Sequence, residues 1–67
     1  MTDPQTLRAV EAVLFAAAEP LTPDSIRAYV GELDVRGALA ALVGHYEGRG
    51  IRLVERGGRW HFETAPD

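Results

Sequence analysis

The spacing of apolar positions changes near residue 46 and divides the chain into two parts. Before that point apolar residues recur every three or four positions, the period of an amphipathic helix. Over residues 51–62 they recur every second position, the period of a strand with one buried face. The pattern therefore predicts helices first and a pair of short strands afterwards.

A first helix is predicted over residues 4–18. Asp3 is a favourable N-cap and Pro4 suits the first helical position. Its apolar positions are Leu7, Val10, Leu14, Ala17 and Ala18. Pro20 ends this helix, and because the residue before a proline prefers extended backbone, residues 19–21 are expected to form a short extended segment.

Two further helices are predicted before the strands. Thr22 and Asp34 are their N-caps, and Pro23 takes the first position of the earlier one. Gly31 and Gly48 offer left-handed ends. The apolar residues expected to face inward are Ile26, Tyr29, Val30 and Leu33, then Val35, Ala38, Leu39, Leu42, Val43 and Tyr46.

The strand part, residues 51–64, is predicted to be a β-hairpin that turns at Gly57-Gly58, a pair that tolerates positive φ. This turn sets the pairs Arg56 with Arg59, Glu55 with Trp60, Leu53 with Phe62 and Arg52 with Glu63. The apolar face then holds Ile51, Leu53, Trp60 and Phe62, and the other face holds Arg52, Val54, Arg56, Arg59, His61 and Glu63. Trp60 serves either as a lid on the core, which we favour, or as an exposed anchor for a partner.

The order of helix, short strand, helix, helix and hairpin describes a winged helix-turn-helix domain. The expected fold class is mainly α with a small β-hairpin (α+β), in one domain covering residues 1–67. A chain of 67 residues buries only about 60% of its unfolded surface, so association with a partner is a reasonable expectation.

The first predicted helix carries apolar residues on almost all sides, which suggests that a second chain covers part of it. After the core positions are assigned, Ala12, Phe15 and Ala16 remain on another side of the helix. These three residues are the first candidates for a protein interface. The alternative is that Phe15 packs under the second helix or under the hairpin.

The outward side of the third predicted helix is small and nearly uncharged. It holds Gly37, Ala41 and Gly44, and a glycine inside a helix costs about 1 kcal/mol relative to alanine. Close packing against another backbone could offset that cost, so these residues are further interface candidates. The alternative is an alanine-rich surface with no role.

Four arginines, Arg49, Arg52, Arg56 and Arg59, gather around the hairpin and could contact phosphate. Against this, the seven basic and ten acidic residues give a net charge of −3, the wrong sign for a domain that mainly coats nucleic acid. For Arg52, a cross-strand ion pair with Glu63 is a simpler explanation than contact with phosphate.

Catalytic and metal chemistry have little support in the sequence. His45 and His61 lack a third ligand at metal spacing, and Ser25 has no histidine close in sequence to activate it. We therefore expect no enzyme, no cofactor and no small-molecule substrate. The start of the chain does not resemble a signal peptide, and the absence of cysteine fits a reducing compartment, so a cytoplasmic protein without a membrane segment is expected.

Two stretches, LRAVEAVLFAAAEPLTPDSI at residues 7–26 and YEGRGIRLVERGGRWHFETAPD at residues 46–67, resemble the N-terminal domain of the segregation and condensation protein B family. The elements that carry the resemblance are EAVLFA at residues 11–16, EPL at 19–21, Tyr46, Gly50-Ile51, Leu53-Val54-Glu55, residues 58–60, Phe62 and Thr64. Their order and spacing together are fairly specific, although each alone is weak.

The resemblance implies a non-enzymatic subunit of the bacterial chromosome-condensing complex, associated with the nucleoid. It implies a homodimer that binds the kleisin subunit, segregation and condensation protein A, and through it the coiled-coil SMC ATPase. Family members carry a second winged-helix domain, so the chain resembles the N-terminal half of a longer protein. Contact with DNA is expected to be indirect or weak at most. The rival hypothesis is a winged-helix transcriptional regulator, which would need basic or amide side chains on its third helix.

Overall fold

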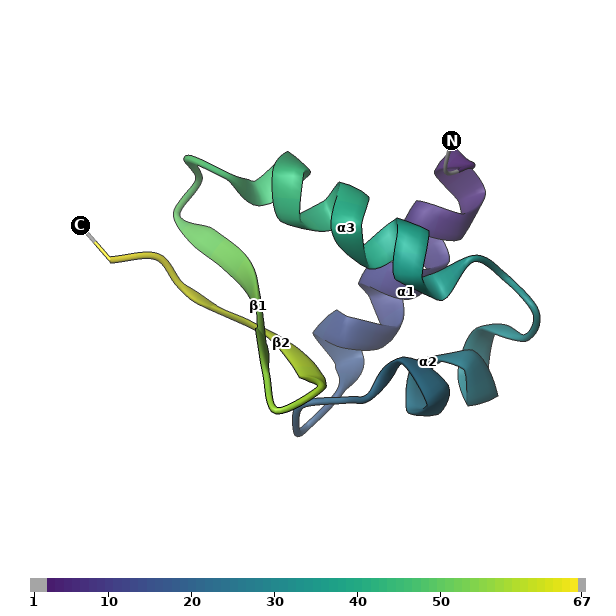
Figure 1. The fold of residues 1–67 in the computed structure, drawn as a ribbon. Coiled ribbons are helices and arrows are strands. Elements are labelled where there is room, and N and C mark those ends of the chain that lie inside the picture. The colour runs from purple at the N-terminus through teal and green to yellow at the C-terminus, as the bar shows by residue number, and fades with distance from the viewer. Residues whose placement is uncertain (1–2, 67) are drawn as a thin grey trace.

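The computed structural model describes residues 3–66 and has a winged-helix architecture of the α+β class (Figure 1). Helix α1 (Pro4–Ala16) is followed by α2 (Pro23–Val30) and α3 (Val35–Tyr46). The antiparallel strands β1 (Ile51–Arg56) and β2 (Arg59–Thr64) then form the hairpin, drawn at the left of Figure 1, with α2 at the lower right.

The predicted helix starts are confirmed, and side-chain caps explain the starts of α2 and α3, whereas Asp3 makes no side-chain cap hydrogen bond and α1 begins at Pro4. The Thr22 hydroxyl accepts a hydrogen bond from the backbone N–H of Ser25 at 3.1 Å, and the Asp34 carboxylate accepts one from the N–H of Gly37 at 3.0 Å. The prediction that the first helix continues to residue 18 is wrong, since α1 ends at Ala16 and Ala17 already has extended backbone. Alanine favours a helix, but Pro20 cannot continue one, and the pairing of Leu21 with Trp60 requires extended backbone before it.

The core lies between the three helices and the inner face of the hairpin. It consists of Val10, Leu14, Ile26, Val35, Ala38, Leu39, Leu42 and Leu53. Trp60 is partly buried against this core, as its predicted role as a lid requires. The core joins all three helices to β1, so the helices and the hairpin form one packed unit.

Three residues expected to face inward are instead exposed. Tyr29 is 74% exposed, because the residues of α1 that share its hollow, Ala12, Val13 and Ala16, have side chains too short to cover a phenol ring. Leu33 lies in the loop after α2 rather than in the helix, and Val43 faces a surface hollow beside β1. Helical spacing correctly placed Ile26 and Leu39, but it could not show that neighbouring elements leave these three uncovered.

The hairpin has the predicted register. Arg56 pairs with Arg59, Leu53 with Phe62 and Arg52 with Glu63. Gly57 and Gly58 make the turn with φ of 60° and 83°, values that glycine adopts without steric cost. Leu21 pairs with Trp60 as an isolated bridge, so the predicted extended segment contacts the edge of β2 through one residue and does not form a third strand.

Candidate interaction surfaces

Phe15 on α1 forms an aromatic cluster with the hairpin and α3. Its ring stacks on that of Phe62, with centroids 4.3 Å apart, and meets Tyr46 edge to face at 6.4 Å. Even so, Phe15 remains 55% exposed. The alternative in which this residue packs against the hairpin is therefore present in the structure, and about half of its surface is still open to a partner.

A hydrogen bond fixes this cluster to the middle of α1. The hydroxyl of Tyr46 donates to the carboxylate of Glu11, and Phe62 lies edge to face against the Tyr46 ring at 5.0 Å. The hydrogen bond to Glu11 raises the pKa of Tyr46 above its usual value. Because α1 and α3 are held here by aromatic and polar contacts together, the position of Phe15 relative to the hairpin is well determined.

Ala12 and Ala16 lie on a different side of α1 and line a shallow apolar hollow of about 500 Å³ between α1 and α2. Its lining consists of Ala12, Val13, Ala16, Ala17, Ala18, Glu19, Leu21 and Tyr29. The structure thus separates the three interface candidates of α1: Phe15 borders the hairpin, whereas the two alanines face the hollow beside Tyr29. The helical pattern placed Tyr29 in the core, so it was not among the predicted interface candidates. The short side chains opposite it were the available signal.

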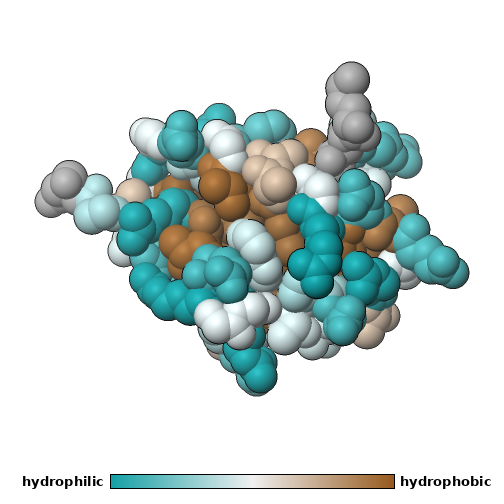
Figure 2. Space-filling view, viewed as in Figure 1, coloured by the Kyte–Doolittle hydropathy of each residue, from teal (hydrophilic) through white to brown (hydrophobic). Residues whose placement is uncertain are grey.

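Apolar surface is also visible in the space-filling view. On the face shown in Figure 2, apolar side chains gather over the middle of the molecule and hydrophilic side chains surround them. An apolar centre with a polar rim is typical of surfaces that bind other proteins.

The two candidate glycines of α3 differ in their surroundings. A Cβ atom at Gly37 would lie 2.1 Å from Oδ2 of Asp34, so the capping carboxylate accounts for this glycine. A Cβ atom at Gly44 would meet nothing within 4 Å. Gly44 and the half-buried Ala41 therefore lie on an open stretch of helix, where another backbone could approach.

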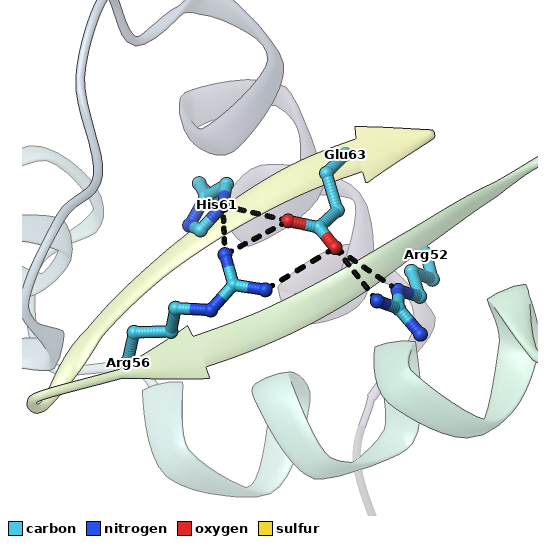
Figure 3. A network of polar contacts seen from close by, with 4 residues as sticks. All are labelled: Arg52, Arg56, His61 and Glu63. Carbon is cyan, nitrogen blue, oxygen red and sulfur yellow. Dashed lines mark hydrogen bonds and ion pairs between the residues drawn. The ribbon is translucent and has the colours of Figure 1, made fainter. Parts of the chain in front are cut away.

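The hairpin arginines do not converge on one site. Arg52 and Arg56 both turn toward Glu63, at 2.8 and 3.0 Å, and the Nε2 atom of His61 lies 3.2 Å from the same carboxylate (Figure 3). Hydrogen bonds from the two guanidinium groups lower the pKa of Glu63 to about 2. Sequence analysis predicted the pair of Arg52 and Glu63, which is confirmed. It missed that Arg56 joins them, although the predicted register placed both on one face.

The other two arginines of this set point elsewhere. Arg49 donates a hydrogen bond from Nε to the carbonyl of His45 at 2.9 Å, and its guanidinium lies 5.8 Å from the centre of the Tyr46 ring. Arg59 is exposed near the turn. Two of the four arginines predicted to contact phosphate, Arg52 and Arg56, therefore already form ion pairs within the hairpin.

Within residues 3–66 the structure brings together no group of three side chains suited to a metal ion. Ser25 accepts a hydrogen bond from the Thr22 hydroxyl at 3.0 Å and is part of the cap of α2. None of the described helices is long and apolar enough to cross a membrane.

Residues 8–67 match the protein family described as Segregation and condensation complex subunit ScpB. The chain is 34% identical over 64 residues to the Segregation and condensation protein B homolog of Coxiella burnetii, covering 87% of this chain and 31% of the relative. It is 38% identical over 68 residues to Segregation and condensation protein B of Desulforamulus reducens, covering 94% of this chain and 37% of the relative.

The chain therefore spans about a third of the length of these curated relatives. No solved structure gives a significant match. The family match extends from the second turn of α1 through the hairpin, so it includes every element of the winged helix. The chain belongs to the family of segregation and condensation complex subunit ScpB.

Proposed function

We propose that this chain is a non-enzymatic, dimerising interaction module of a bacterial SMC–kleisin complex that condenses and segregates chromosomes. It acts at the nucleoid in the cytoplasm and supports binding of the kleisin subunit, segregation and condensation protein A. Family membership supports the assignment to the complex. Because the relatives are about three times as long, the partner contacts are a proposal for the whole protein as well as for this part of it.

One observation carries the interaction role: α1 leaves apolar residues exposed on two sides after the core has formed. Phe15 is 55% exposed on the hairpin side, and Ala12 and Ala16 are exposed beside the hollow that also holds Tyr29. A tyrosine beside small residues is a favourable contact for a second protein, since its ring supplies area at low cost in side-chain entropy. We place the dimer contact on the Ala12 side.

Sedimentation equilibrium over a wide concentration range tests this placement. Ala12→Glu should raise the dissociation constant of the dimer by about tenfold or more, because it places a charge in an apolar contact. The control is Ala28→Glu, which changes an exposed alanine of α2 outside the hollow. Phe15 is a poorer probe, since its loss would also weaken the fold.

Two results would contradict the proposal. One is a chain that stays monomeric at every concentration. The other is a dimer that Ala12→Glu and Ala28→Glu weaken equally, which would mean that the contact lies elsewhere. Kleisin binding is a separate question, which titration of segregation and condensation protein A into the chain and into its Ala12→Glu variant would answer. We expect binding to weaken together with dimerisation.

The rival role, a DNA-binding regulator, has weaker support. The outward side of α3 offers Arg36 as its basic residue beside Ala40 and Gly44, and base-reading helices normally present several polar side chains. Fluorescence anisotropy with duplex DNA distinguishes the two roles. A regulator would bind one sequence preferentially and lose that preference with Arg36→Ala. We expect at most weak binding that decreases with salt.

A further inference from the structure

The outer edge of β1 has unpaired backbone groups. The N–H of Trp60 donates to the carbonyl of Leu21 at 2.7 Å, and the N–H of Leu21 donates back at 3.0 Å, so the polar groups of Trp60 point away from β1. In an antiparallel pair of strands, the backbone N–H and C=O groups of two opposite residues either bond to each other or both point away from the partner strand. Glu55, opposite Trp60, therefore points its N–H and C=O away from β2, as do Leu53 and Ile51 by alternation.

A second contact gives the same result from the other end of the hairpin. The N–H of Ala65 donates to the carbonyl of Gly50 at 3.0 Å, so even-numbered residues of this strand face β2 and odd-numbered ones face outward. In the described chain, residues 3–66, no hydrogen bond from outside the hairpin reaches the backbone of Ile51, Leu53 or Glu55. Such an edge is a template for another extended chain.

The side chains that would normally protect this edge are turned away from it. Charged residues on an edge strand usually hinder pairing with a further strand. Here Arg52 and Arg56 reach across β1 toward Glu63 on β2 (Figure 3). The ion cluster around Glu63 therefore draws the charged ends of both arginines toward β2, although Arg52 still borders the hollow beside the edge.

A hollow of about 500 Å³ lies along this edge, between β1 and the end of α3. Its lining consists of Val43, Tyr46, Glu47, Gly48, Arg49, Arg52, Leu53, Val54, Ala65 and Pro66. Val43 is 39% exposed there and could receive an apolar side chain. Within the described residues no carboxylate pairs with Arg49, and Arg52 shares the single carboxylate of Glu63 with Arg56, so that ion cluster keeps one uncompensated positive charge. Arg49 and this cluster together outweigh the negative charge of Glu47 in the hollow.

We propose that the outer edge of β1 binds an extended, acidic segment of another polypeptide as an added strand, with an apolar side chain on Val43 and an acidic one at Arg49. The odd-numbered residues of β1 would supply the hydrogen bonds, and the hollow would select the side chains, as in other cases of strand addition. This site goes beyond the proposed function and does not depend on it. It also lies apart from the α1 surface assigned to the dimer.

A second copy of the chain fits this edge poorly because of charge. Antiparallel pairing of two β1 strands centred on residue 52 sets Arg52 opposite its own copy, and pairing centred on residue 54 sets it opposite Arg56. Pairing centred on Leu53 sets Arg52 opposite Val54 of the other copy. Arg52 and Arg56 of that copy are then its diagonal neighbours. Like charges at these positions are destabilising, and an acidic segment avoids all three arrangements.

The test is selection from a phage-displayed library of random peptides of about ten residues, with the 67-residue chain as target. Enriched peptides should alternate apolar and polar residues and carry acidic ones. Synthetic copies should slow amide hydrogen exchange at Ile51, Leu53 and Glu55. Ile51→Pro removes one outward N–H that the hairpin does not use, and should weaken binding about tenfold. Its control, Ile51→Val, keeps that N–H and should bind within about twofold of the original chain.

Arg49→Glu gives a second test that leaves the backbone of the hairpin unchanged. It should also weaken binding, because it reverses the charge that favours acidic peptides. The proposal is overturned by a library that yields no enrichment, by peptides that leave exchange at Leu53 unchanged, or by peptides that bind the Ile51→Pro and Arg49→Glu variants as well as the original chain. Protection of the Leu53 amide that rises with chain concentration in the absence of peptide would assign the edge to a second copy, and would also overturn it.

Discussion

The stack of Phe15 on Phe62 provides a quantitative prediction for Phe15→Ala. Phe15 is 55% exposed, so about 45% of its surface is covered. For a phenylalanine of roughly 200 Å² this is about 90 Å², which at about 25 cal/mol per Å² contributes about 2 kcal/mol. The stacked geometry, with centroids at 4.3 Å, adds about 0.5–1.5 kcal/mol. We expect Phe15→Ala to lower the free energy of unfolding by about 2.5–3.5 kcal/mol.

That loss is large for a domain of this size, whose total stability is expected to be roughly 3–10 kcal/mol. Urea denaturation followed by circular dichroism measures it, at low chain concentration so that association contributes little. Phe62→Ala and the double variant complete a thermodynamic cycle, in which the two rings should couple by about 0.5–1.5 kcal/mol.

Two outcomes would refute this reasoning. A loss below about 0.5 kcal/mol, the size of an ordinary surface substitution, would mean that the stack does not form in solution. A loss that appears only at high chain concentration would mean that Phe15 is covered by a second chain rather than by the hairpin.

Two further predictions concern the helix glycines and the acid stability of the hairpin. Gly44→Ala should stabilise the monomer by up to about 1 kcal/mol, because alanine is the better helix former and the added Cβ meets nothing. Gly37→Ala should destabilise it, because the added Cβ would displace the Asp34 carboxylate from its capping hydrogen bond with the N–H of residue 37, and thermal unfolding of both variants at one concentration checks the opposite signs. Glu63 has a pKa lowered to about 2 from an ordinary value near 4.5, so its ion pairs stabilise the fold above pH 4.5 and are lost as the pH falls toward 2. Glu63→Gln should therefore be less stable than the original chain at pH 7, and urea denaturation should show the difference closing between pH 4.5 and 2. A difference that does not change with pH would contradict the ion pairing.

Sequence analysis predicted the candidate surfaces only in part. It placed Ala12, Phe15 and Ala16 together as one interface, because helical spacing shows which residues leave the core stripe. The structure divides them between the hairpin side and the hollow beside Tyr29. Spacing along one helix contains no information about which neighbouring element stands opposite each residue, so this division could not be predicted.

The sequence by itself determined the element order, the helix starts and the hairpin register. Each depends on residues close together in the chain: a capping side chain, a proline that fixes φ, or a glycine pair that permits positive φ at the turn. The position of the turn alone determined which residues of the two strands lie opposite each other, and so placed Arg52 and Glu63 on one face.

Only the tertiary structure decided which side chains are covered and which backbone groups remain free. Tyr29 and Val43 satisfy the helical pattern but are exposed, because no other element of the described part of the chain covers them. Among residues 3–66 the outward backbone groups of β1 have no partner, because Leu21 pairs with the other edge of the hairpin, at Trp60. Burial and pairing depend on residues distant in sequence, and their arrangement is fixed only when the helices and the hairpin pack together.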